Sequence, residues 1–394
     1  MPSIRSIRVH EAAIRLRHRI RHASHDRTAN QTLLVRTELS DGAVGWGEGL
    51  PREYVTGETI DTAWRHAAGL QQFVGRSVES PADCIPLIDT LRFDGDDPRG
   101  CLGNSVRCAW DISLLDAASR STGQPIGAVL DDIVPAAMRV SARRLRYSPV
   151  LPAASTRRKA VWRAVRMRAW DMRGIKLKLG IDGHDDETTL RRYRRWLGRR
   201  ITRVDANEAW TADELPGKLA MLARNGVYLC EQPLPHAAMS TVQGIRRAGQ
   251  PVAIMLDESF CSASDLAAAL GQNEASAFNI RLSKCGGLVA SARLYREIQQ
   301  ASVERDQPLG VMLGCQVGET AILSAAGRAF ASPLPEIGYV EGSYDRYLVH
   351  DALSGEDITF ARGGWADPLT GPGLGVTIDE EAVERVTARR REFA

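Results

Sequence analysis

Apolar residues recur with two different periodicities in the first 130 residues. Apolar and β-branched residues alternate with polar ones in residues 4–14, 32–39 and 43–48, and a Ser-Asp-Gly turn signal separates the last two runs. This pattern predicts the strands of an antiparallel sheet. Apolar residues then recur at helical intervals in residues 59–74 and 105–119. We therefore expect residues 1–130 to form an α+β unit.

From about residue 137 onward, short apolar runs alternate with longer amphipathic stretches. Such alternation is typical of βαβ units, and eight strands with helices between them predict a (β/α) barrel over residues 131–355. After about residue 350 the alternation stops. A loop-like stretch and a short charged helix make up the tail, residues 356–394, which we expect to pack on the N-terminal unit. The candidate barrel strands are residues 138–145, 174–179, 202–206, 227–231, 252–257, 277–282, 310–313 and 338–341.

The composition fits a large folded protein and narrows its partners. Hydrophobic residues make up 44% and charged residues 25% of the 394 residues, and the formal net charge is only +3. This balance gives no strong attraction to nucleic acid or to an anionic membrane. The seven cysteines form no CxxC pair, and no apolar run is long enough for a signal peptide or a membrane helix. We expect a cytoplasmic protein with reduced cysteines.

Five charged residues recur at a nearly constant pitch along the predicted barrel. Lys178, Asp205, Glu231, Asp257 and Lys284 follow one another at intervals of 26 or 27 residues, each at or just after the end of a candidate strand. A constant pitch of one βα unit places them at the C-terminal rim of the barrel, where active sites are built. Because adjacent strands lie about 4.8 Å apart, the three carboxylates should converge.

Converging carboxylates repel one another unless a cation lies among them. Oxygen ligands with open positions suit Mg²⁺, so Asp205, Glu231 and Asp257 are candidate ligands of one divalent cation. Lys176 and Lys178 should both point inward, since side chains alternate along a strand. Two ammonium groups held close together should lower each other's pKa toward the ~7–8 that suits a general base.

Each of these residues also has a plain structural explanation. A single acidic residue at a strand end usually caps a helix, a lone lysine is usually solvated, and a Lys-x-Lys pair also suits an edge strand. The regular pitch of the whole set is what favours a site over these explanations.

The motifs around these residues resemble those of the enolase superfamily, in the muconate-lactonizing-enzyme branch that includes dipeptide epimerases and N-acylamino acid racemases. The resemblance covers nearly the whole chain. It implies a modified (β/α)7β barrel with an N-terminal α+β capping domain that the C-terminal tail completes. The matching segments are GIKLK at 174–178, VDAN at 204–207, CEQP at 230–233, LDES at 256–259 and NIRLSKCGG at 279–287.

The resemblance also implies roles for the residues. Asp205, Glu231 and Asp257 would bind Mg²⁺, with Asn207 and Glu258 supporting them. Lys178 and Lys284 would be acid/base residues on opposite faces of the substrate carbon, while Lys176 would tune Lys178 and touch the substrate carboxylate. The implied reaction removes a proton α to a carboxylate through an ene-diolate. We expect racemisation or epimerisation of an N-acylamino acid or dipeptide-like substrate, by a homo-oligomer.

Substrate choice in this family lies in the capping loops and near the last barrel strand. The corresponding loops are residues 19–30, a basic stretch that includes Arg27, and residues 50–58, which include Tyr54. Some dipeptide epimerases hold the substrate ammonium with an Asp-x-Asp motif at the last strand. Here the sequence is VEGSYD, so Glu341 or Asp345 would have to serve.

Three alternatives stay open. The same lysines and metal also serve a cycloisomerase that lactonises a muconate, or a dehydratase like o-succinylbenzoate synthase. Arginine clusters at 157–173 and 191–200 could bind nucleic acid. However, Leu190, Tyr193 and Leu197 share one helical face among them, which favours the solvated outer side of a barrel helix. A protein without catalysis is disfavoured because every residue that the chemistry needs is present.

Overall fold

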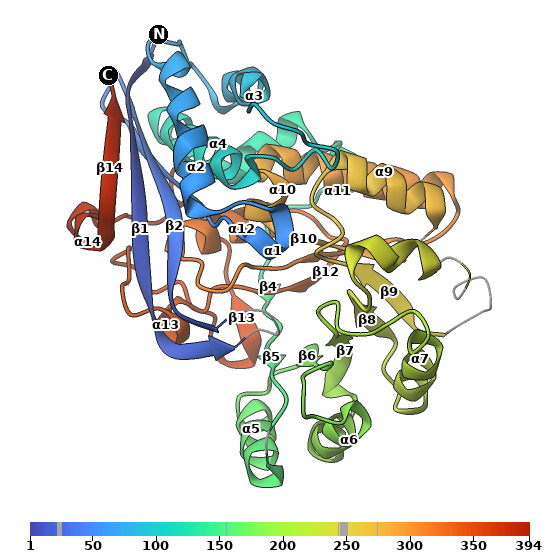
Figure 1. Ribbon diagram of the computed structural model, residues 1–394. Coiled ribbons are helices and arrows are strands. Elements are labelled where there is room, and N and C mark those ends of the chain that lie inside the picture. Colours follow the sequence, from blue (N-terminus) through green and yellow to red (C-terminus); the bar gives the residue numbers. More distant parts are fainter. Residues whose placement is uncertain (22–25, 155, 243, 245–250, 274) are drawn as a thin grey trace.

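The chain forms an antiparallel sheet covered by helices and a barrel of parallel strands (Figure 1). The computed structural model describes residues 1–21, 26–154, 156–242, 244, 251–273 and 275–394, without the side chains of residues 19–21, 26 and 27. No helix in these ranges is both long and apolar enough to cross a membrane.

The antiparallel sheet has the strand order β14-β1-β2-β3. Its strands are β1 (Ile4–Arg21), β2 (Asp26–Leu39), β3 (Val44–Gly49) and β14 (Thr387–Phe393). Sequence analysis predicted that a charged helix ends the chain, and this was wrong in part, because α14 (Glu380–Val386) is followed by β14. β14 pairs with β1, where Arg8 donates two hydrogen bonds to Glu392. The tail therefore completes the N-terminal sheet, and both termini lie at the same end of the molecule (Figure 1).

Helix α4 (Asn104–Ser121) packs directly on strand β3. Gly45, Gly47 and Gly49 face it, and a Cβ atom on any of them would lie within 2.2 Å of the α4 backbone. The alternating glycines of β3 therefore allow the close approach of helix and sheet. The smaller helices of this unit are α1 (Glu53–Thr56), α2 (Ile60–His66), η1 (Ala67–Phe73), α3 (Pro81–Thr90), η2 (Ile126–Asp132) and η3 (Ala136–Met138).

The second sheet has eight parallel strands in sequence order, and Val340 forms a bridge to Tyr147, so the sheet closes on itself. The first strand was predicted at residues 138–145, which is wrong, because residues 140–144 are exposed and the first barrel strand is β5. The strands are β5 (Val150–Leu151), β6 (Ile175–Lys178), β7 (Ile201–Asp205), β8 (Leu229–Glu231), β9 (Ala253–Leu256), β10 (Ala277–Ile280), β11 (Gly310–Leu313) and β12 (Ile337–Val340).

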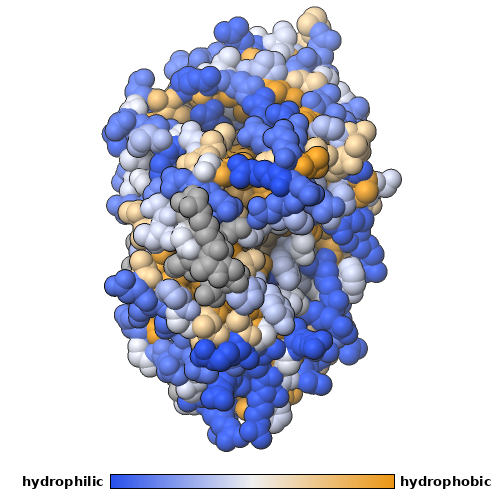
Figure 2. All heavy atoms as spheres, turned by 90° about the vertical axis from the view of Figure 1, so that its right-hand side faces the viewer, coloured by the Kyte–Doolittle hydropathy of each residue, from blue (hydrophilic) through white to orange (hydrophobic). Residues whose placement is uncertain are grey.

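Helices cover the outside of the barrel. In α6 (Asp186–Leu197), Leu190, Tyr193 and Leu197 are buried, as expected for the inner side of a barrel helix. The face seen in Figure 2 is largely hydrophilic, with apolar residues scattered over it. The other barrel elements are α5 (Arg157–Ala169), η4 (Gly198–Arg200), α7 (Leu215–Arg224), η5 (His236–Thr241), α9 (Ala263–Gln272), α10 (Leu282–Cys285), α11 (Leu288–Glu304), α12 (Ala321–Ala331) and α13 (Asp345–Leu348), with η6 (Arg362–Gly364) and the β4 (Leu145–Arg146) and β13 (Trp365–Ala366) pair beside them.

Helix α4 also fixes the segment that follows β10. The Asp111 carboxylate accepts hydrogen bonds from the backbone N–H groups of Leu288 at 3.0 Å and Val289 at 2.9 Å, so it caps the start of α11. The Asn104 side chain donates to the Lys284 carbonyl at 2.7 Å. Because both residues belong to α4, the N-terminal unit holds the β10–α10–α11 segment in place.

Candidate active site at the carboxyl ends of the barrel strands

Three acidic residues lie at the carboxyl ends of three adjacent strands. Lys178 pairs with Asp205 in the β6–β7 register, and Asp205 pairs with Glu231 in the β7–β8 register. Asp257 follows the end of β9, two residues beyond Met255, which pairs with Glu231. Each of the three carboxylates is no more than 1% exposed. The pitch in the sequence thus corresponds to a row of buried carboxylates along one rim of the barrel.

Lys176 lies among these carboxylates. Its Nζ donates to both carboxylate oxygens of Glu231, at 3.0 and 3.1 Å, and lies 3.4 Å from Asp205 and 3.1 Å from Glu341. Sequence analysis expected a lowered lysine pKa. Burial does act in that direction, but the carboxylates of Glu231, Glu341 and Asp205 outweigh it and raise the pKa of Lys176. Lys176 is therefore a fixed cation in this arrangement.

Lys178 has a different environment at the end of the same strand. It is half-buried, and its Nζ donates to the Asn207 side-chain oxygen at 2.9 Å. Asn207 has a left-handed backbone, with φ 46°, and its N–H donates to Asp205 at 3.0 Å. This turn after β7 positions Asn207 between the lysine and the carboxylate. Burial opposes ionisation of Asp205, but Lys176, Lys178 and Arg281 together lower its pKa.

At the end of β10, Arg281 and Lys284 both interact with Asp257. Lys284 donates to Asp257 Oδ1 at 2.9 Å, while the Arg281 guanidinium forms an ion pair with Asp257 Oδ2 in a geometry that makes no hydrogen bond. Lys284 also donates to the carbonyls of Asp257 at 2.6 Å and Asn279 at 2.9 Å, and it is 0% exposed. Burial lowers the pKa of Lys284.

Two residues of the matched motifs that received no role in the sequence analysis also belong to this site. The Gln232 side-chain oxygen accepts hydrogen bonds from the N–H groups of Asp257 and Ser259, so it joins the ends of β8 and β9. The Asn279 amide donates to Glu231 at 2.9 Å. Gln232 directly follows Glu231, and Asn279 lies two residues before Arg281. The strand period would have shown that Asn279 and Arg281 share the inward face.

The donor set at this rim suits a hard divalent cation. All the acidic groups offer oxygen atoms as metal ligands. Among the described residues, Asp257 Oδ2 and Glu258 Oε2 are buried without a hydrogen bond. Burial together with the charges of Asp205, Glu208 and Glu231 raises the pKa of Glu258 to about 8. Within the described ranges no three acidic, His or Cys side chains are already arranged around a metal position, and Lys176 and Arg281 neutralise the carboxylates instead.

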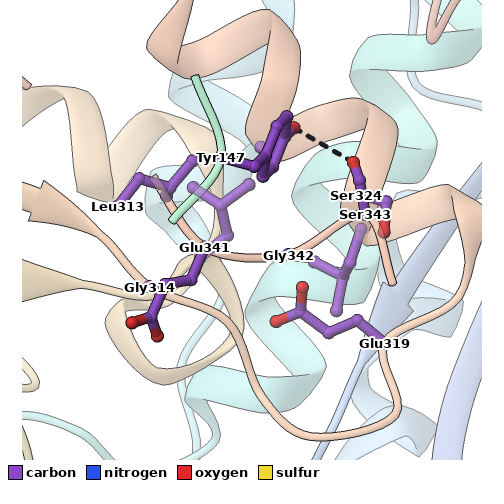
Figure 3. Close-up of a pocket in the computed structure, with 11 residues that line it drawn as sticks. Tyr147, Leu313, Gly314, Glu319, Ser324, Glu341, Gly342 and Ser343 are labelled. Carbon is purple, nitrogen blue, oxygen red and sulfur yellow. Dashed lines mark hydrogen bonds between the residues drawn. The ribbon is translucent and has the colours of Figure 1, made fainter. Parts of the chain in front are cut away.

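The two candidate acidic groups near the last barrel strand are both engaged. Glu341 pairs with Lys176 and Arg203 and is 6% exposed. Asp345 accepts a hydrogen bond from Ser324, and burial raises its pKa to about 6. Figure 3 shows the small pocket between β11, β12 and α12, where Glu341 and Glu319 lie on neighbouring segments.

Of the two candidate substrate contacts in the capping loops, only Tyr54 has a described side chain. Tyr54 lies in α1, partly buried against Val55, Cys101 and Cys261, of which Cys261 follows the end of β9 by five residues. The side chain of Arg27 lies outside the described residues.

Comparison with known proteins agrees with this architecture. An L-Lys-D/L-Arg epimerase of Methylococcus capsulatus is 28% identical over 355 residues, which span 87% of this chain and 90% of the relative. Muconate cycloisomerase 1 of Rhodococcus opacus is 26% identical over 374 residues, 93% of each chain. The solved structure of a dipeptide epimerase from Cytophaga hutchinsonii, complexed with Mg and the dipeptide D-Ala-L-Val, has the same fold, with a TM-score of 0.84 at 20% identity over 100% of both chains.

A family model matches a longer stretch than any single motif does. The model described as "Enolase C-terminal domain-like" covers residues 158–382, which is more than half of the chain. The stretch includes the five residues of the pitch and the strands that carry them. This chain therefore belongs to the enolase C-terminal domain-like family, among the isomerases of the muconate-lactonizing branch of the enolase superfamily.

Proposed function

We propose that this protein is a magnesium-dependent isomerase that moves a proton on the carbon α to a substrate carboxylate. Asp205, Glu231 and Asp257 would hold one Mg²⁺, which when bound neutralises charge on the substrate's carboxylate oxygens. The observation that carries the proposal is the register of β6, β7 and β8, which sets Lys178, Asp205 and Glu231 side by side at one rim.

Lys178 is the proposed acid/base. It is only half-buried, and a neutral side-chain amide, not a carboxylate, accepts its hydrogen bond. Lys176, by contrast, lies among three carboxylates, and although burial opposes the change, they raise its pKa. Lys176 would hold Glu231 and Glu341 in place and add positive charge near the substrate carboxylate.

The chemistry explains why this much charge is gathered here. Removing a proton α to a carboxylate puts a second negative charge on its oxygens. Positive groups already fixed around those oxygens stabilise the ene-diolate more than the ground state, and they need no reorganisation during the step. The Lys178 ammonium formed in that step can then return the proton.

The substrate class is drawn from the relatives. Those reported above are epimerases of dipeptides and a muconate cycloisomerase. We propose a small carboxylate of one of these types, with Tyr54 of helix α1, which packs against Cys261 after β9, as a candidate contact.

Deuterium exchange tests the function directly. Purified protein with Mg²⁺ in D₂O is mixed with N-succinyl-lysine, L-Ala-L-Ala or cis,cis-muconate, and deuterium at the α-carbon of substrate or product is followed by NMR. We expect incorporation with at least one compound, lost in Lys178→Ala and kept in Lys159→Ala, a lysine on the outer helix α5. Failure of all three compounds together with failure to bind Mg²⁺ in calorimetry would contradict the proposal.

A further inference from the structure

The segment after β10 places two cations at different depths. Asn279 points into the barrel, since its amide donates to Glu231. Arg281 is two residues farther along in extended backbone, with φ −125° and ψ 122°, so its side chain leaves on the same inward face. Lys284 comes three residues later, after the chain has turned into α10. Arg281, and not Lys284, thus continues the row of side chains at the rim.

All three N–H donors of the Lys284 ammonium are engaged inside the protein. An ammonium group has three N–H donors, and Lys284 donates to Asp257 Oδ1 and to the carbonyls of Asp257 and Asn279. Its side chain is 0% exposed, and its own carbonyl accepts from Asn104 of α4. Two of the three acceptors are backbone carbonyls at the ends of β9 and β10, so the bonds tie these strand ends together.

Arg281 lies close to the carboxylates instead. It forms an ion pair with Asp257 and lies 4.0 Å from Glu258. Along the rim, the order is Lys178, Asp205, Glu231, Asp257 and then Arg281. The three carboxylates therefore lie between one lysine and one arginine.

We propose that the site has a single acid/base, Lys178, and that Arg281 is a permanent cation on the other side of the carboxylates, while Lys284 is a positioning residue that fixes Asp257. This inference rests on the proposed function. A guanidinium stays protonated in proteins, so it can pair with substrate oxygens but cannot accept a proton. The site then exchanges protons on one face of the substrate carbon only.

One-face chemistry selects the class of isomerisation. Racemisation through two bases needs a proton acceptor on each face, whereas a cycloisomerisation needs one acid/base. In the lactone-forming direction, an internal carboxylate oxygen forms a C–O bond to a conjugated double bond, and the electron pair of that bond moves onto the second carboxylate. The Lys178 ammonium then gives its proton to the α-carbon and regains one from solvent. Counted as free acids, substrate and product are isomers, so no oxidant is needed. The geometry therefore favours a conjugated dicarboxylate or its lactone as substrate.

Stereochemistry in D₂O distinguishes one face from two. With cis,cis-muconate, we expect deuterium in only one of the two positions on the α-carbon of the lactone. With enantiomerically pure N-succinyl-lysine, we expect any exchange to proceed with retention, at least 100-fold faster than inversion. Inversion as fast as exchange in the wild-type protein would overturn the inference and leave the proposed function intact.

Substitutions at the β10 end give a second, independent test. Arg281→Lys introduces a group that can lose a proton, and we expect it to raise the ratio of inversion to exchange at least 10-fold. Lys284→Met should slow exchange because Asp257 loses its partner, but the folded fraction, measured by circular dichroism, should keep the wild-type ratio of inversion to exchange. A folded Lys284→Met protein whose ratio of inversion to exchange differs from the wild-type ratio at saturating Mg²⁺ would show that Lys284 acts on the substrate and would overturn the inference.

The chain has only five lysines, so their ammonium groups can be followed one by one. With ¹⁵N-lysine labelling, the Lys284 ammonium should give a signal protected from water exchange, because all three protons are hydrogen-bonded and buried. The Lys178 signal should exchange rapidly. We expect Mg²⁺ to shift the Lys178 signal while the Lys284 signal stays protected. Rapid exchange at Lys284, assigned through Lys284→Met, would contradict the proposed role even if no carboxylate were turned over.

Discussion

The two ends of the charged row, at β6 and at β10, look alike in the sequence and differ in the structure. At β6 the two lysines alternate on one strand, so both point into the barrel, and one of them stays half-exposed. At β10 the strand ends at Ile280, and the lysine of the motif lies on a helix that α4 holds from outside. The difference teaches that a constant pitch brings residues to the same rim but does not decide which of them faces the substrate.

The largest effect should come from Lys178→Gln, which keeps length and polarity but cannot take a proton. General acid/base groups typically contribute 10²–10⁴-fold to a rate, so we expect a loss of about 10³-fold in kcat for the best compound. Thermal stability should change little, because Lys178 is only half-buried and its ammonium donates to the neutral side-chain amide of Asn207. If Lys178→Gln lost stability but kept its rate, Lys178 would have the structural role that we assign to Lys284.

Sequence patterns predicted the barrel well where strands are long enough to carry an apolar run. Four-residue strands such as β9 and β11 were predicted within two residues of their bounds. β5 has two residues and leaves no such pattern, so the prediction moved to an exposed stretch. β14 was missed because Arg389, Arg390 and Arg391 give it a polar face, and its pairing with β1 depends on contacts such as Arg8 with Glu392.

The positions of the three carboxylates at the rim follow from the pitch, whereas the positions of the cations follow from it only in part. The three carboxylates follow strand ends directly, so the pitch alone identifies them. The placement of Lys284 depends on where β10 stops and α10 begins, and four residues of sequence do not distinguish those two conformations. At Arg281 the backbone is extended, and a helical turn follows it. Where this change occurs depends on contacts with the rest of the fold and not on the local sequence.

The next prediction concerns Mg²⁺ affinity, which Glu231→Gln should lower. The substitution removes one negative charge and leaves Lys176 with fewer charged acceptors. We expect Mg²⁺ affinity to fall by about 10²-fold in calorimetry, a change of about 2.7 kcal/mol. Arg281→Met should act in the opposite direction, since it removes a cation from Asp257. Weaker binding in Arg281→Met would mean that the guanidinium supports the metal site.

Lys284→Met should affect stability more than chemistry. Breaking a buried ion pair by removing one partner typically costs about 3–5 kcal/mol, and the two backbone carbonyls that Lys284 joins would also lose their donor. We expect a loss near the lower figure, because Arg281 still pairs with Asp257. Urea unfolding measures the change, with Lys218→Met on α7, where the lysine is 28% exposed, as the control. A loss no larger than that of the control would mean that the three hydrogen bonds are not formed in solution.

The last test concerns how α4 holds the β10 end, through the pH dependence of Asp111→Asn. Burial raises the pKa of Asp111 to about 7, with Arg107 and Arg293 acting in the opposite direction. A carboxyl whose pKa is higher in the folded than in the unfolded state binds its proton more tightly when folded, so its contribution to stability is complete below about pH 4. That contribution is lost as the pH rises to about 7. Asparagine does not titrate, and its single amide oxygen can replace only one of the two acceptors that Leu288 and Val289 use, at a cost that does not depend on pH. The wild-type protein should therefore lose stability relative to Asp111→Asn between pH 4 and 7. Urea unfolding at both pH values measures this difference, and a constant difference would show that Asp111 stays ionised while it caps α11.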